Sequence, residues 1–549
     1  MRERKPRARF WLGVLILTLT ILSAVFIEAA PLSAQEGTEP ADVIAQAGSD
    51  FDAPISTADH SEFAELAGPF ATGPDVTAAC LKCHTEAAEQ MMATTHWTWE
   101  AIAPDGGEVG KNNVINNYCV AVTSNEPRCT SCHTGYGYTN SSFDFSVETN
   151  VDCLVCHDTT GTYKKFPTGA GHPVYEPKEF PAGSGNIWQP PDLALVAQNV
   201  GETSRETCGA CHFYGGGGDG VKHGDLDSSM ANPSFDLDVH MSPDGEDFTC
   251  TTCHTADNHQ ISGSRYEMAA HDTGEAIPAM DEDLATCESC HGTEPMADPK
   301  LNDHVDTIAC QTCHIPEFAR ELPTKMWWDW SKAGQMNAEG VPYAEKDDNG
   351  WVVYDTKKGE FVWEMNVQPD YVWFDGNVSY LAATDTIDPD SVVDINTFHG
   401  SPDDGVSRIW PVKTFTGIQP YDAGNNVLAI PHLFGSDDAA YWKTYNWDAA
   451  LAAGMATAGY DYSGEYGWVE TQMLWPTTHM VAPAEDALQC ESCHTDDGRL
   501  ENVEGVYIPG RDNNAIVDNL GWGILGLALV GVVIHGGARI ALGNRREER

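Results

Sequence analysis

Residues 129–157 read CTSCHTGYGYTNSSFDFSVETNVDCLVCH and contain the pattern Cys-x-x-Cys-His twice. Two thiols separated by two residues reach the two vinyl groups of one porphyrin, and the histidine that follows turns its imidazole onto the iron. A bound porphyrin supplies much of the apolar core around it, so a chain with many such patterns does not need long regular elements. This pattern therefore decides the fold class.

The chain of 549 residues carries eight copies of the pattern, which use sixteen of its 17 cysteines. One copy alone would also fit half of a zinc site or a redox dithiol, but zinc sites do not demand a histidine after every Cys-x-x-Cys. We therefore predict eight covalent haem c groups. The predicted attachment residues are Cys80, Cys83, Cys129, Cys132, Cys153, Cys156, Cys208, Cys211, Cys250, Cys253, Cys287, Cys290, Cys310, Cys313, Cys490 and Cys493. The predicted proximal iron ligands are His84, His133, His157, His212, His254, His291, His314 and His494.

The predicted fold class is a multihaem cytochrome c with mainly short α-helices and loops packed around the haems and little β-sheet. The 51 glycines and 31 prolines agree with a loop-rich chain. We expect residues 76–510 to form the octahaem domain, in which residues 315–489 carry no motif and wrap the haem array. Residues 35–75 are expected to be an acidic, poorly ordered lead-in.

The charge and the apolar runs bear on location. A formal net charge of -52 excludes nucleic acid as a partner of the body, because a polyanion would be repelled. Residues 1–34 resemble a signal peptide, with an uncleaved anchor as the alternative. Residues 520–538 are long and apolar enough for a transmembrane helix, and residues 539–549 form a basic tail that favours the cytoplasmic side. The body is thus expected at the periplasmic or extracytoplasmic face of the cytoplasmic membrane, held by a single C-terminal anchor.

Each low-spin haem needs a sixth ligand, and imidazole is the usual one. The predicted distal ligands are His60, His96, His223, His240, His259, His304 and His479. The remaining histidines of the body are interpreted as hydrogen-bonded or surface groups: His172, His271, His399 and His432.

Several stretches resemble the octahaem tetrathionate reductase family of c-type cytochromes: CHFYGGGGDGVKHGDLD, IACQTCHIPEFAR, WPTTHMVAPAEDALQCESCH and the segment around residues 116–165. The resemblance covers about residues 58–500. It implies bis-histidine ligation at every haem but one, a catalytic haem with lysine as its distal ligand, and a free cysteine nearby. The C-terminal anchor departs from the soluble form of that family.

Lys222 is the preferred lysine, with Lys164 and Lys165 as rivals. The glycines at 215–218 let the backbone approach a flat porphyrin, and neighbours in an extended segment point to opposite sides. Lys222 and His223 could thus bind different irons, and we assign Lys222 to the haem of the motif at 129.

Other polar groups near that motif are catalytic candidates with alternatives. Cys119 is either a small buried hydrophobe or a thiol that exchanges with a substrate sulfur. The rare cations near the second and third motifs either hold an anionic substrate or pair with propionates and solvent: Lys111, Arg128, Lys164 and Lys165.

The sequence thus predicts an extracytoplasmic oxidoreductase of anaerobic respiration, with tetrathionate reduction to thiosulfate as the expected reaction. Nitrite or hydroxylamine reduction at the same haem is one alternative. A non-catalytic electron-transfer cytochrome between the quinone pool and periplasmic acceptors is another. The anchor suggests a quinol-oxidising membrane cytochrome b as a partner.

Overall fold

The computed structural model describes residues 58–102, 108–263, 286–512 and 514–547. The predicted signal peptide and residues 35–57 of the predicted lead-in lie outside the described residues, as does His271. All described residues belong to one compact unit of the chain.

Short helices carry the Cys-x-x-Cys-His motifs, in line with the sequence. The α-helices before the sheet are α3 Gly73–Cys80, α4 Ala87–Met92, α5 Thr95–Thr98, α6 Glu126–Cys129, α7 Leu154–His157, α8 Leu193–Gln198, α9 Arg205–His212, α10 Cys250–Cys253, α11 Glu288–His291, α12 Pro299–Val305 and α13 Cys310–His314. The α-helices that come later in the chain than the first strands of the sheet are α14 Tyr441–Thr444, α15 Trp447–Ala458, α16 Cys490–Cys493 and α17 Ala515–Glu547. The 3-10 turns are η1 His60–Glu62, η2 Ala64–Leu66, η3 Thr130–Cys132, η4 Glu148–Asn150, η5 Ser228–Ala231, η6 Trp330–Lys332 and η7 Ala484–Asp486.

Local capping explains why such short helices form. Ser204 accepts a hydrogen bond from the Thr207 amide and so satisfies an amide at the start of α9, and Thr72 forms a capping box with Asp75 at α3. Asp298 caps α12, where Pro299 occupies the first helical position. These caps fix where each helix begins.

The lead-in is more ordered than the sequence predicted over its described part. Residues 58–75 include η1, η2 and the start of α3, with Asp59 capping η1. Leu66 is buried in a cluster with Val76 and Val196. This apolar contact with α8 holds the segment in place despite its acidic composition.

The expectation of little β-sheet is wrong for residues 324–476. The described residues contain a nine-stranded sheet in the order β13-β17-β15-β7-β10-β9-β8, to which β11 and β16 add by pairing with β15. Its strands are β7 Thr324–Asp329, β8 Ala344–Lys346, β9 Val352–Asp355, β10 Gly359–Glu364, β11 Asp370–Phe374, β13 Val393–Asp394, β15 Arg408–Asp422, β16 Val427–Leu428 and β17 Tyr466–Pro476. Short two-stranded pairs are β1 Ala101–Ile102 with β2 Glu108–Val109, β3 Lys178–Glu179 with β4 Ile187–Trp188, β5 Ala256–Asp257 with β6 Gln260–Ile261, and β12 Val378–Tyr380 with β14 Asn396–Phe398.

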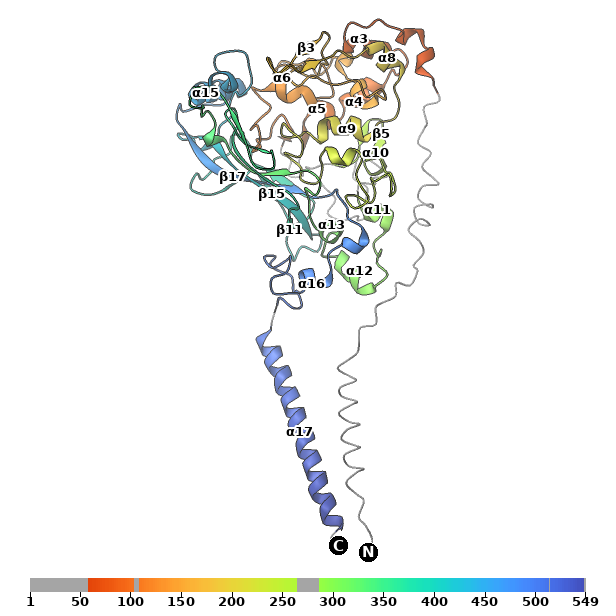
Figure 1. Ribbon diagram of the computed structural model, residues 1–549, viewed down its shortest axis with the longest axis vertical. Helices are drawn as coiled ribbons and strands as arrows, with labels where there is room; N and C mark the ends of the chain where they lie inside the picture. Colours follow the sequence, from red (N-terminus) through yellow and green to blue (C-terminus); the bar gives the residue numbers. More distant parts are fainter. Residues whose placement is uncertain (1–57, 103–107, 264–285, 513, 548–549) are drawn as a thin grey trace. The chain divides into compact units, whose positions relative to one another are not determined.

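Strand β15 is the centre of this sheet. It pairs antiparallel with β17 from Val412 opposite Pro476 to Asp422 opposite Tyr466, and parallel with β7 at residues 416–418. Figure 1 shows β15 and β17 running side by side. At its start the strand also contacts the motif-bearing segment, where Ile409 forms a parallel bridge with Ile308.

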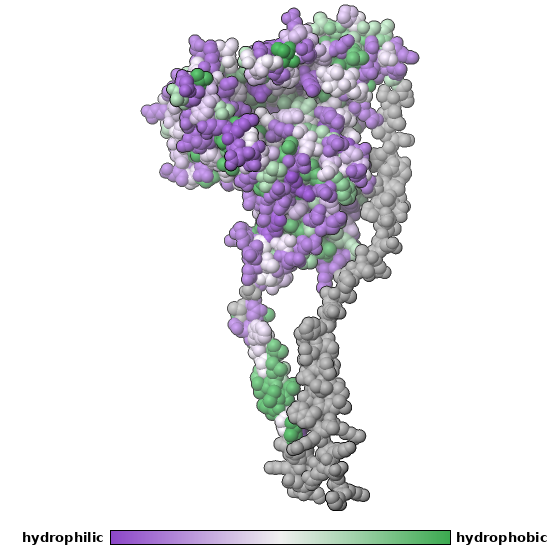
Figure 2. Space-filling view, in the orientation of Figure 1, coloured by the Kyte–Doolittle hydropathy of each residue, from purple (hydrophilic) through white to green (hydrophobic). Residues whose placement is uncertain are grey.

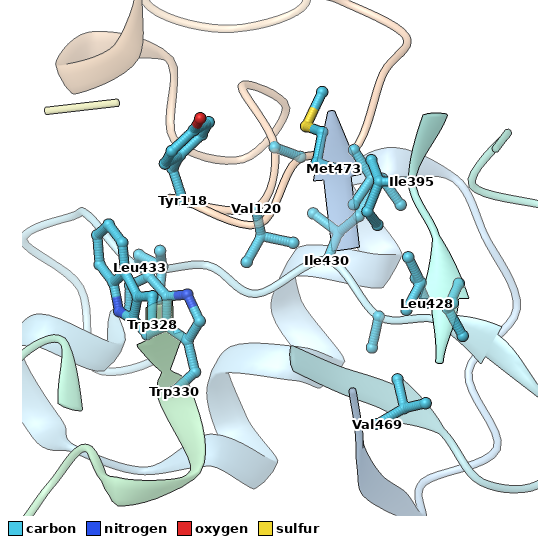
Figure 3. Packing of buried hydrophobic residues seen from close by; sticks show 14 of the residues in the cluster. Tyr118, Val120, Trp328, Trp330, Ile395, Leu428, Ile430, Leu433, Val469 and Met473 are labelled. Atoms are coloured by element: carbon cyan, nitrogen blue, oxygen red, sulfur yellow. The ribbon is translucent and has the colours of Figure 1, made fainter. Parts of the chain in front are cut away.

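The sheet exists because residues 315–489 hold no motif and must build a core from their own side chains. Trp328, Trp330 and Met473 are buried in one large apolar cluster, into which Tyr118 and Val120 reach from the motif-bearing segment (Figure 3). Trp328 and Trp330 stack with ring centres 4.8 Å apart. Aromatic and β-branched residues favour strands, which is why this segment forms a sheet.

Helix α17 contains residues 516–540, a span long and apolar enough to cross a membrane, in agreement with the predicted helix at 520–538. Its large apolar side chains between Ile516 and Leu542 are exposed, and Figure 2 shows an apolar stretch on this helix. The predicted tail at 539–549 continues this helix up to Glu547, and the last two residues lie outside the described part.

Candidate haem sites and active centre

Proximal and distal histidines face each other in pairs. Two imidazoles that bind one metal ion from opposite sides, each through a bond of about 2 Å, have ring centres roughly 6 Å apart. Among the described residues, such separations occur for His60 with His84 at 6.2 Å, His96 with His212 at 6.1 Å, His240 with His291 at 6.0 Å, His254 with His479 at 6.4 Å and His304 with His494 at 6.2 Å. Each pair joins one motif histidine to one predicted distal ligand.

Hydrogen bonds at Nδ1 orient several of these rings. A ring that donates from Nδ1 keeps its lone pair on Nε2, which is the atom that binds a metal. Nδ1 bonds a backbone carbonyl at His157, His254, His304 and His494, at distances of 2.8–3.0 Å. Nδ1 of His259 bonds the Gln90 side chain at 3.0 Å, and Nδ1 of His479 lies 3.2 Å from Asp225 Oδ2. These rings are held in the tautomer and orientation that axial ligation requires.

Burial favours the neutral imidazole in the pair formed by His96 and His212. It lowers the pKa of His96 to about 4 and that of His212 to about 3, with smaller contributions from nearby cations. A neutral imidazole offers a lone pair to iron, whereas an imidazolium does not. The site therefore suits ligation at neutral pH.

The remaining histidines of the predicted ligand set have different surroundings. Burial, followed by the neighbouring His157 and His84, lowers the pKa of His259, so His259 lies close to His157. Burial, followed by His291 and His240, lowers the pKa of His314. The predicted distal ligand His223 packs edge-on against Trp475, with ring centres 5.2 Å apart.

The motif cysteines form a continuous series of neighbours. Thiols from different motifs are neighbours that shift one another's pKa in the pairs Cys80 with Cys153, Cys132 with Cys211, Cys208 with Cys250 and Cys287 with Cys310. Three further pairs interact electrostatically: Cys156 with Cys208, Cys253 with Cys290 and Cys313 with Cys493. Named by their first cysteine, the motifs are thus spatial neighbours in the order 80, 153, 208, 250, 287, 310 and 490. The motif at 129 is a neighbour of the motif at 208 and forms a side branch.

These residues fit covalent haem c. Each motif sulfur would bond a porphyrin vinyl edge, so neighbouring sulfurs mark neighbouring porphyrin edges. The paired imidazoles would occupy the axial positions. When bound, haem supplies one-electron storage and an iron that can also bind a ligand from solution.

The motif at 129 differs from the others. His133 is buried among Trp97, Trp99 and Tyr138, with ring centres 5.0–5.3 Å away. Its Nε2 lies 2.6 Å from the Trp97 carbonyl oxygen, while its Nδ1 is buried with no hydrogen-bond partner in the described structure. Burial lowers the pKa of His133 to about 3. This proximal histidine thus shows neither the ring pairing nor the Nδ1 anchoring found elsewhere.

Lys222 and Cys119 are gathered around the glycine loop. Gly216 and Gly217 have φ angles of +78° and +90°, which favour glycine. A Cβ on Gly217 would lie 3.8 Å from Cys119 Sγ, and one on Gly215 would lie 3.0 Å from the Lys222 side chain. Tyr118 donates from its hydroxyl to the Lys222 carbonyl at 3.1 Å. Cys119 also lies near enough to Cys129 to contribute to the raised pKa of that thiol, so the loop lies beside the motif at 129.

The rival lysines have other contacts. Lys165 forms an ion pair with buried Asp152 at 3.1 Å and donates to the His133 carbonyl. Asp152 also accepts from the Tyr136 and Tyr163 hydroxyls. Lys164 is exposed. The structure therefore uses Lys165 as a structural ammonium.

The other predicted anion-binding cations are also engaged. Arg128 donates to the Pro167 carbonyl at 3.0 Å. Lys111 is exposed and lies over the Trp99 ring at 4.7 Å.

The histidines interpreted as structural are hydrogen-bonded, in line with that prediction. His432 bonds Ser124 and Asp437, His399 bonds Ser379, and His172 bonds Tyr175. His432 Nε2 lies 3.0 Å from Asp437. Their ring nitrogens serve packing contacts of the chain itself.

Sequence reasoning missed two buried lysines. Lys413 donates to the carbonyls of Val221 and Lys222, both at 3.1 Å, and to Thr324 Oγ1 at 2.5 Å. Lys325 lies 3.3 Å from the Phe361 ring centre and 3.9 Å from that of Trp328. Burial lowers the pKa of both lysines well below the ordinary value. A lone lysine inside an apolar strand pattern was the available signal, in TKMWWD and WPVKTFTG.

Comparisons with known proteins agree with this account. Family models match at residues 79–158 (cytochrome c554 and c-prime), 233–315 (cytochrome c7 and related cytochrome c) and 325–497 (cytochrome c bacterial). An uncharacterized protein of Archaeoglobus fulgidus is 23% identical over 244 residues, which cover 37% of this chain and 80% of that protein.

A solved structure extends the likeness over most of the chain. The crystal structure of octaheme cytochrome c from Shewanella oneidensis matches with 45% identity and a TM-score of 0.71, over 80% of this chain and 95% of that one. Identity at this level over nearly all of the relative joins the two chains in one family. The protein is therefore a redox protein that belongs to the multihaem c-type cytochromes.

Proposed function

We propose that this protein is a membrane-anchored extracytoplasmic octahaem reductase that splits tetrathionate into two thiosulfates, with Lys222 as the distal ligand at the motif beginning at Cys129. The reaction takes two electrons and breaks the central S–S bond of a dianion. The chain must therefore deliver electrons to one place, free a metal position there and hold a negative substrate.

The observation that carries the proposal is the meeting of Lys222 and Cys119 at the glycine loop beside Cys129. Lysine binds a metal only when deprotonated, and burial favours that form. The Lys222 ammonium nitrogen lies 4.5 Å from the Trp475 ring centre, in a half-buried setting. The ion pair of Lys165 with Asp152 further supports Lys222 over its rivals.

The surrounding charges suit an anion. Lys325 interacts electrostatically with Cys119. Lys358 and Lys413 also interact with Lys325 and contribute to its lowered pKa. A concentration of lysines is unusual in a chain with only 30 basic residues. In their protonated forms these lysines would attract a dianion against the negative charge of the whole protein.

Cys119 has a role that fits sulfur chemistry. Its thiol can exchange with a sulfur of the substrate, since a thiolate attacks an S–S bond and displaces the other half. Displacement by Cys119 would release one thiosulfate and leave the other bonded to the cysteine. Two electrons from the haem array would then release the second thiosulfate and restore the thiol.

The branch in the series of neighbouring thiols supports the delivery of electrons to the motif at 129. The motif at 129 joins the rest through Cys132 and Cys211. Electrons stored along the series would reach it through the motif at 208. We further propose that α17 anchors the protein beside a quinol-oxidising membrane partner that supplies these electrons.

The test is Lys222→His in the haem-loaded protein. An added imidazole should fix the distal position, so tetrathionate reduction by the chemically reduced variant should fall at least a hundredfold while uptake of electrons by the array stays unchanged. Lys443→His is the matched control, because Lys443 is exposed and pairs only with surface groups at residues 436 and 438 in the described structure. Full activity and an unchanged spectrum in Lys222→His would remove Lys222 from the iron. Turnover of nitrite and hydroxylamine in parallel distinguishes the substrate.

A further inference from the structure

The loop that carries Lys222 and His223 also carries a buried carboxylate. Asp225 is almost fully buried and its Oδ2 accepts from the Thr478 amide at 2.7 Å and the His479 amide at 3.0 Å. The same oxygen lies 3.2 Å from His479 Nδ1. The two backbone bonds hold the carboxylate in place against the ring.

His479 differs in this respect from the other axial candidates. Where the Nδ1 partner is recorded in the described residues, the other rings bond a backbone carbonyl or, at His259, a neutral amide. A carboxylate draws the Nδ1 proton more strongly and makes the imidazole a more basic ligand. A more basic axial ligand stabilises the oxidised iron and lowers the reduction potential.

The negative charge at Asp225 is itself supported by the fold. Lys413 is fully buried on β15 and is acted on by Asp225. Hydrogen bonds and the imidazole lower the pKa of Asp225 despite its burial. The two backbone amides that donate to Oδ2 favour the carboxylate form of Asp225, and it is this form that perturbs His479.

We propose that Asp225 is a positioning and tuning residue that lowers the reduction potential of the haem held by His254 and His479. In the thiol series the motif at 250 stands between those at 208 and 287, so this haem connects the part of the array near Lys222 to the part near residue 490. Its potential sets how readily electrons pass between the two parts. This inference does not depend on the substrate.

The test is an EPR-monitored redox titration of haem-loaded Asp225→Asn. Asparagine keeps an oxygen that accepts from the two amides but has no charge to offer Nδ1. We expect the equilibrium constant for reduction of one haem to rise about tenfold, which is about 59 mV for one electron. The reduction potentials of the other haems should stay unchanged.

Asp227→Asn is the matched control. Asp227 is equally buried and lies two residues further on, but its carboxylate bonds Ser229 and no imidazole in the described structure. An equal upward shift in both variants would show a general effect of lost charge and would overturn the proposal. Unchanged potentials in Asp225→Asn would overturn it as well.

The unmodified protein supplies a second test that does not depend on a variant folding. In protein labelled with carbon-13 at aspartate carboxyl groups, the infrared difference between reduced and oxidised forms should contain a labelled carboxylate band that follows the reduction of one haem. The label distinguishes aspartate from haem propionates. The absence of any labelled band would refute the contact between Asp225 and a redox-active centre.

Discussion

Replacing Lys413 with methionine tests whether the sheet holds the loop that carries the candidate active site. Methionine keeps most of the apolar stem and removes the ammonium group. The Lys222 carbonyl would keep the Tyr118 hydroxyl as a donor, whereas the Val221 carbonyl would lose the recorded donation from Lys413. Asp225 would lose its electrostatic interaction with the buried amine of Lys413.

The expected loss of stability follows from these two effects. A buried carbonyl left unpaired costs about 1–3 kcal/mol, and removing one member of a buried charge pair costs about 3–5 kcal/mol. Burial lowers the pKa of Lys413, so the neutral form reduces the second cost toward its lower limit. The two costs share one group and do not add, so we expect a loss of about 3 kcal/mol in the free energy of unfolding.

Urea unfolding followed by circular dichroism measures this change. The control is Lys443→Met, which breaks a pair between exposed side chains 2.9 Å apart and should cost about 0–1 kcal/mol. If the two variants lose the same free energy, Lys413 does not stabilise the loop and the reasoning from its hydrogen bonds is wrong.

Three further predictions concern the haems, the anchor and a motif contact. A denatured, alkaline pyridine spectrum should give about eight haems per chain, because all eight motifs are complete, and seven or fewer would mean an unused motif. A chain cut before Leu520 should be released from membranes, since the apolar span lies within 516–540, and retention would point to an uncleaved N-terminal anchor. Arg408→Met should lower the midpoint of urea unfolding more than Arg205→Met, because Arg408 pairs with buried Glu288 while Arg205 pairs with exposed Asp247.

The sequence predicts the cofactor chemistry well because that chemistry is local. Two cysteines and a histidine within five residues define an attachment site without any knowledge of the fold. Predicted distal ligands such as His96 and His304 lie near a motif in the sequence, and the rings of both face motif histidines. Proximity along the chain was therefore a usable guide there.

The pairing itself could not be predicted, because it depends on contacts between distant segments. His96 faces His212 rather than the motif at 80 that precedes it, and His479 faces His254 rather than the motif at 490 that follows it. A distal ligand is supplied by whichever loop passes over the porphyrin. No local sequence pattern predicts which loop does so.

The sheet was missed for a related reason. Its strands are separated by up to several dozen residues, and β15 pairs with β7 in parallel across about 90 positions. Loops rich in glycine and aspartate between the strands agreed with the expectation of a wrapping segment without regular structure. The strand pattern was readable in residues 408–422, but the haem motifs dominated the interpretation.

The position of β15 explains why a haem cytochrome contains such a sheet. Arg408 pairs with Glu288 inside the motif at 287, and the Ile409 carbonyl accepts from Thr312 inside the motif at 310.

Further along the same strand, Pro411 accepts from Thr477, two residues before His479, and Lys413 holds the backbone that carries Lys222. Haem attachment fixes each motif only to its own porphyrin. A rigid strand that contacts several motifs and ligand loops in turn fixes their separations, and electron transfer depends on those separations. The segment without motifs thus contributes to redox function by holding the haem sites in register.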